Sequence, residues 1–72
     1  MKFKKGILKV KYDGVEYLAE YIGRQQGFEC AVCGQGENCF TFNIFNNEAD
    51  YKDGIYETLG FGSKHINKLE LI

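Results

Sequence analysis

The stretch that decides the fold of this chain spans residues 6–23 and reads GILKVKYDGVEYLAEYIG. Apolar and polar residues alternate on both sides of the central Asp13-Gly14 pair. Alternation around Asp-Gly is the strongest short-range hairpin signal, because a type I′ turn needs positive φ at both central residues. A two-residue loop sets Tyr12 opposite Val15, and it also sets lysine opposite glutamate on the other face. The stretch therefore predicts an antiparallel hairpin.

Length and composition indicate one small, strand-rich domain. The chain has 72 residues, of which 44% are hydrophobic and 15% aromatic, and its net charge is −1. We expect a single domain over residues 1–72, and the many phenylalanines and tyrosines favour strands. No apolar run approaches the about 20 residues of a membrane span, and no apolar signal region follows the first residues. We therefore expect a cytoplasmic protein with reduced cysteines.

Beyond the hairpin, residues 23–27 read as a connector and residues 46–50 as a loop. Further strand patterns cover residues 28–33, 39–45 and 68–72. An extended segment with no clear inward face lies at residues 55–59, and Ser63 can cap one short 3₁₀ turn before the last strand. Short strands, frequent turns and one helical turn before the final strand are typical of a small closed barrel.

The strand order, together with residues 10–19 (VKYDGVEYLA), resembles the Src-homology-3-like barrels, including Tudor and chromo-barrel modules. The matching features are the Asp13-Gly14 turn, a following aromatic residue and Ala19. The resemblance implies an all-β fold: a five-stranded antiparallel Src-homology-3-like barrel with one short 3₁₀ turn before the last strand. The chain has no tryptophan and no proline, residues with which peptide-binding members grip polyproline, so we do not expect that ligand.

Three cysteines and one histidine are the residues with metal-ligand chemistry. Cys30, Cys33, Cys39 and His65 would complete a tetrahedral zinc set. The Cys-x-x-Cys-Gly motif looks like half of a zinc ribbon, but the second half is missing. In a continuous strand Cys30 and Cys33 point to opposite faces, which sets Cys33 opposite Cys39 on the outer face, as thiols or as a short-loop disulfide. We therefore expect no cofactor, and zinc is the alternative.

The basic residues near the N-terminus suggest a second alternative, a nucleic-acid-binding barrel that uses Lys5, Lys9 and Lys11 with nearby aromatic residues. In the hairpin register, however, Lys11 lies opposite Glu16, and the near-neutral net charge gives no field that would attract a polyanion. We expect these lysines to form a solvated strand face that discourages edge-to-edge pairing.

No nucleophile lies beside a base in this sequence, so we do not expect an enzyme. The five tyrosines are too many to be buried in so small a barrel, and exposed tyrosines are good interface anchors. We expect a non-enzymatic protein-binding module, such as a phage or mobile-element inhibitor of the anti-defence or anti-CRISPR type, that occludes a partner surface. Its open strand edges also allow a homodimer. The expected contact residues are Tyr12, Tyr51, Asp53 and Tyr56, with Glu48 and Asp50 as rim charges.

Overall fold

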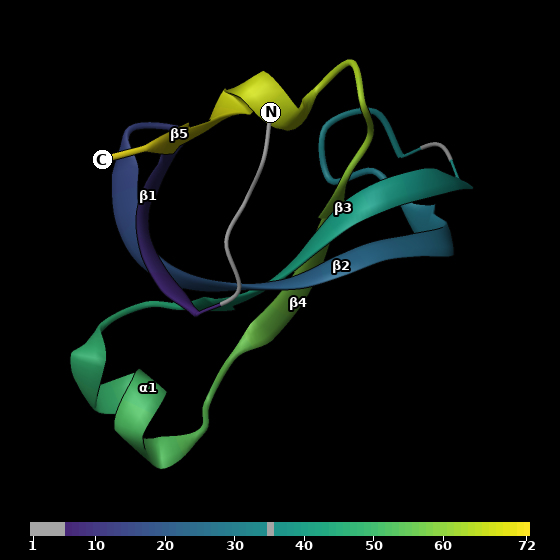
Figure 1. Ribbon diagram of the computed structural model, residues 1–72. Coiled ribbons are helices and arrows are strands. Elements are labelled where there is room, and N and C mark those ends of the chain that lie inside the picture. The colour runs from purple at the N-terminus through teal and green to yellow at the C-terminus, as the bar shows by residue number, and fades with distance from the viewer. Residues whose placement is uncertain (1–5, 35) are drawn as a thin grey trace.

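The computed structural model describes residues 6–34 and 36–72, without the side chain of Glu37, and shows an antiparallel sheet with little helix (Figure 1). In chain order the elements are β1 (Ile7–Tyr12), β2 (Val15–Glu29), β3 (Gly36–Phe45), α1 (Glu48–Asp53), β4 (Glu57–Phe61), the 3₁₀ helix η1 (Ile66–Lys68) and β5 (Leu69–Leu71). The five strands follow the order β4-β3-β2-β1-β5. The predicted all-β class and five antiparallel strands are confirmed. The sheet is open between β4 and β5, so the predicted closed barrel is not confirmed.

The first hairpin forms in the predicted register. Tyr12 pairs with Val15, and Asp13 and Gly14 have φ values of 52° and 80°. Both values lie in the left-handed region that a type I′ turn needs. Val10 is fully buried, whereas the lysines on either side of it are exposed. The alternation therefore sets which face of the hairpin packs against the core.

Strand β2 is longer and more bent than predicted. Residues 23–27, predicted as a connector, lie within it, and its register with β3 shifts between residues 21 and 23 and between residues 25 and 28. Such irregularities are typical of β-bulges, which bend a strand and increase its twist. The curve of β2 across the sheet is clear in Figure 1. It brings the end of β2 beside β4, where Cys30 forms an isolated parallel bridge with Gly60.

Several further predicted boundaries differ from those in the structure. The strand predicted at residues 28–33 ends at Glu29, and residues 31–33 form a turn. The segment predicted at residues 55–59 forms strand two residues later, as β4. The predicted 3₁₀ turn does precede the last strand, but its N-cap position is His65 rather than Ser63, and no side chain caps it.

Helix α1 replaces part of the loop predicted at residues 46–50 (Figure 1). Asn47 occupies the N-cap, and its Oδ1 accepts a hydrogen bond of 2.8 Å from the N–H of Asp50. Gly54 ends the helix with a φ of 71°. These caps satisfy backbone groups that a short helix leaves unpaired at its ends. No helix in the described part of the chain is long and apolar enough to cross a membrane.

The core lies within the curved sheet and includes the C-terminal segment. Phe42 of β3 and Phe61 of β4 are fully buried and meet edge to face, with ring centroids 6.1 Å apart. Leu69 and Ile66 are 2% and 7% exposed and belong to the same cluster. Burial of these two side chains holds η1 against the sheet and thereby positions His65, which directly precedes η1.

Candidate metal centre

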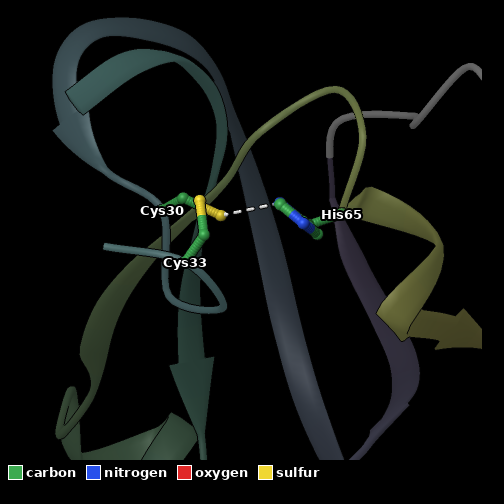
Figure 2. Close-up of side chains that lie close together, drawn as sticks. All are labelled: Cys30, Cys33 and His65. Carbon is green, nitrogen blue, oxygen red and sulfur yellow. Dashed lines mark hydrogen bonds between the residues drawn. The ribbon is translucent and has the colours of Figure 1, made fainter. Parts of the chain in front are cut away.

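Three potential metal ligands, Cys30, Cys33 and His65, converge where the end of β2 meets the segment before η1 (Figure 2). One ligand atom from each residue lies within 4.8 Å of the other two. Cys30 Sγ lies 3.5 Å from His65 Nδ1, and this contact joins residues 35 positions apart.

A tight turn at residues 30–34 brings the two cysteines together. The N–H of Gly34 donates a hydrogen bond of 2.7 Å to the carbonyl of Cys30, and Gly34 has a φ of 75°. A positive φ is the conformation that glycine adopts most readily. Figure 2 shows the side chains of Cys30 and Cys33 side by side. The prediction that they point to opposite faces is wrong, because alternation holds only for extended backbone and β2 ends before the turn.

Cys30 is also held by strand β4 and by the residue that follows it. The N–H of Ala31 donates a hydrogen bond of 2.8 Å to the carbonyl of Gly60. The N–H of Gly62 donates to Cys30 Sγ over 3.4 Å. A Cβ atom at Gly60 would lie only 3.0 Å from Cδ1 and 3.3 Å from Cβ of Phe28 on β2, and 3.0 Å from the Cβ of Cys39 on β3. Glycine at position 60 therefore allows the end of β2 to approach β4 this closely. This role of Gly60 could not be predicted from sequence, because the approach of β2 to β4 is a contact between distant segments.

The segment that carries His65 is held by hydrogen bonds at both its ends. The N–H of His65 donates a bond of 2.9 Å to the carbonyl of Gly62. One guanidinium nitrogen of Arg24, on β2, lies 2.9 Å from Ser63 Oγ and donates to it. The imidazole itself is half-buried. The ring is therefore positioned mainly by its backbone and by the burial of Ile66 next to it.

The surroundings of Cys30 favour its thiolate. Burial raises the pKa of the Cys30 thiol, but hydrogen bonds from the backbone of Gly62, Cys33 and Val32 lower it, and so does a hydrogen bond from the Cys33 side chain. The net effect lowers this pKa from 9.0 to about 6. Donors aimed at a sulfur stabilise its charged form. Because the thiolate is the form that binds metals, Cys30 is prepared for ligation at neutral pH.

The spacing of the ligand atoms fits a zinc ion. With Zn–S near 2.3 Å and Zn–N near 2.0–2.1 Å, tetrahedral geometry sets a sulfur and a nitrogen ligand about 3.6 Å apart. The observed Sγ–Nδ1 distance is 3.5 Å. Two thiolates and an imidazole are donors that zinc prefers. Cys30, Cys33 and His65 can therefore bind such an ion with little rearrangement of Cys30 and His65.

Cys39 does not belong to this group, so the predicted four-residue set is wrong in one member. Cys39 lies on β3 opposite Gln25, is fully buried, and donates a hydrogen bond of 3.3 Å from its Sγ to the carbonyl of Phe28. Cys39 is not paired with Cys33 in the sheet, and the two form no disulfide. The predicted cross-strand pair fails because β3 pairs with β2 and not with residues 30–33.

Most of the residues predicted to contact a partner lie on or near α1. Tyr51 and Tyr56 are 43% and 53% exposed, and both rings pack edge-on against Phe45, with centroids 5.2 and 5.6 Å away. Tyr12 is half-buried against Phe61, and with Tyr56 it lines a cavity of about 470 Å³. The acidic residues of the predicted set are all on α1: Glu48 and Asp53 are exposed, and Asp50 is half-buried. Their contact with a partner stays a prediction.

The lysines predicted for the nucleic-acid alternative are placed only in part. Lys9 and Lys11 are exposed on β1, and Lys11 lies opposite Glu16, as the register predicted. Lys5 lies outside the described residues. The described part of this strand face therefore carries charges of both signs.

Comparisons with known proteins identify no relative: no family model, no curated protein and no solved structure matches this chain. The resemblance to Src-homology-3-like barrels therefore stays a prediction.

Proposed function

We propose that this protein is a small zinc-binding β domain in which Cys30, Cys33 and His65 are the ligands. The observation that carries the proposal is the convergence of three ligand atoms within 4.8 Å, one pair of them at the spacing of two zinc ligands. The residues come from two distant segments, so the cluster is a product of the fold and not of local sequence alone.

An ion at this site would join the turn at residues 30–34 to the segment that leads into η1. The ion would add to the Cys30–Gly60 bridge and the bond from the Gly62 N–H to Cys30 Sγ, which already join these segments. Small domains have limited cores, and a metal ion is a common supplement. Structural zinc in small peptides contributes about 10 kcal/mol of binding free energy that becomes folding free energy. The exposed Cys33 leaves the site accessible to solvent from one side.

Metal titration of the chelator-treated, reduced protein tests this proposal. We expect native mass spectrometry to show one zinc ion per chain, lost on denaturation, and Co²⁺ to give the absorption of a tetrahedral site with two sulfur ligands. Cys33→Ser and His65→Ala should weaken binding strongly. Cys39→Ala is the matched control, because Cys39 is outside the cluster, and it should retain the ion. Binding that is absent, or that depends on Cys39, would contradict the proposed site.

A second candidate function is binding to another protein through the aromatic surface near α1, formed by Tyr51, Ile55 and Tyr56. These side chains are 43–58% exposed. Large exposed side chains that lie close together on a small protein are typical of interaction sites. An inhibitor from a phage or mobile element would use such a surface to occlude a partner. Tyr51→Ala combined with Tyr56→Ala should abolish capture of that partner. Lys64→Ala, an exposed position between β4 and η1, should leave capture unchanged.

A further inference from the structure

We propose that Cys30 and Cys33 form a thiol pair that exchanges with small disulfides, in which Cys33 reacts first and Cys30 then closes an intramolecular disulfide. This exchange does not require that the protein binds a metal. Its effect on metal binding rests on the function proposed above.

The first step follows from the unequal exposure of the cysteines. Cys33 lies in an exposed turn, whereas Cys30 is 2% exposed and Cys39 is fully buried. A thiol can attack an external disulfide only if that disulfide can approach its sulfur. Cys39 is further shielded, because its Sγ donates to the carbonyl of Phe28 inside the sheet. Cys33 is therefore the cysteine that an external disulfide can reach.

The second step follows from the distance between the two sulfurs. Cys30 Sγ and Cys33 Sγ lie within 4.8 Å of each other. A disulfide requires about 2.05 Å between sulfurs and Cβ atoms about 3.5–4.5 Å apart. Residues 31–33 form a turn outside the strand ladder, so rotation of the Cys33 side chain can close the remaining distance. Cys39 cannot compete, because it is fully buried and its sulfur is not among the ligand atoms that lie within 4.8 Å of one another.

The chemistry balances with a low-molecular-weight disulfide, RSSR, as the oxidant. The Cys33 sulfur, after loss of its proton, attacks one sulfur of RSSR. A new bond joins Cys33 to that sulfur, the S–S bond of RSSR breaks, and the departing thiolate takes up a proton as RSH. The Cys30 thiolate then attacks Cys33 Sγ and displaces the second RSH. Two protein thiols are oxidised by two electrons, and one RSSR is reduced to two RSH.

Disulfide formation and metal binding exclude each other. Both sulfurs are ligands in the proposed zinc site, and a disulfide sulfur carries no negative charge to donate to the ion. Oxidation would remove two of the three ligands and release the ion. Conversely, a bound ion occupies both thiolates and blocks the first attack. Zinc at ten times its dissociation constant would leave only the ion-free fraction reactive and slow the exchange about elevenfold.

The test is intact-mass and peptide mass spectrometry of the full chain after treatment with glutathione disulfide, with and without zinc. For the chelator-treated wild type we expect a product lighter by two hydrogen atoms, with Cys30 linked to Cys33. Rapid alkylation at early times should trap a glutathione adduct at Cys33. Cys30→Ser should stop at that adduct, Cys33→Ser should form no adduct, and Cys39→Ala should behave as wild type.

The opposite results would overturn the inference. They are a stable adduct in the wild type without an internal disulfide, first reaction at Cys30 or Cys39, or a bond that includes Cys39. The trapped adduct in the wild type needs no variant, so a variant that fails to fold leaves the test decisive. The zinc arm separates the two proposals. Exchange that proceeds equally fast with zinc present contradicts the proposed metal site but leaves the thiol pair standing.

Discussion

Alanine in place of Gly60 should destabilise the protein and weaken metal binding together. Gly60 is buried in β4, and an added Cβ would lie 3.0 Å from the Cβ of Cys39 and 3.0 and 3.3 Å from two side-chain atoms of Phe28. Distances of 3.0 Å are shorter than ordinary contacts between carbon atoms, which lie near 3.5–4.0 Å. Two of these neighbours are Cβ atoms, which cannot rotate away, so the backbone of β2 or β3 has to shift.

The magnitude follows from the cost of overpacking. One extra methyl group in a well-packed region costs about 1–3 kcal/mol. For a domain of this size, each kcal/mol lowers Tm by about 4–8 °C. The shift also acts on the site, because Gly60 accepts the hydrogen bond of Ala31 and bridges Cys30. We therefore expect zinc affinity to fall in the same variant.

Urea unfolding of the reduced, chelator-treated protein measures the first effect, and competition for zinc with a chromogenic chelator measures the second. Gly36→Ala is the matched control. Gly36 also lies in a strand, has no positive φ, and has nothing within 4 Å of an added Cβ. The control should change the free energy of unfolding by less than about 0.5 kcal/mol. Equal stabilities of the two variants, or an unchanged zinc affinity in Gly60→Ala, would refute the reasoning.

Three further predictions concern pH, zinc and the helix cap. The metal-free protein should become more stable relative to Cys30→Ser as pH rises from about 6 towards 9, because the lowered pKa of Cys30 favours its thiolate in the folded state. That contribution is complete above pH 9.0 and is lost as the pH falls through about 6, so parallel urea titrations with a flat difference across this range would contradict it. Zinc at 100 times its dissociation constant should stabilise the folded protein by about 2.7 kcal/mol, and a melting temperature that a chelator does not change would argue against binding. Asn47→Ala removes the bond to the N–H of Asp50 and should cost about 1 kcal/mol. Hydrogen exchange should then quicken in α1 while zinc binding is kept, and loss of zinc binding would show that α1 and the site are coupled.

The first hairpin could be predicted from sequence because its information is local. The Asp13-Gly14 turn and the alternating residues on each side specify register and face over a few consecutive positions. Helix α1 could not be found by periodicity, because a six-residue helix is less than two turns long and shows no repeating apolar face. Its capping residues, Asn47 and Gly54, were the available signal.

The sequence by itself determined the hairpin, the all-β class and the kinds of ligand available, since each depends on residue type and short-range pattern. Only the tertiary structure decided which ligands meet. Strand β2 is bent by bulges and ends at Glu29. The Cys30–Gly60 bridge holds that end beside β4, and burial of Ile66 positions His65 next to the two cysteines. Strand alternation wrongly predicted a separate strand over residues 28–33 with Cys39 opposite Cys33, because bulges and the close approach of two backbones arise from packing between distant segments.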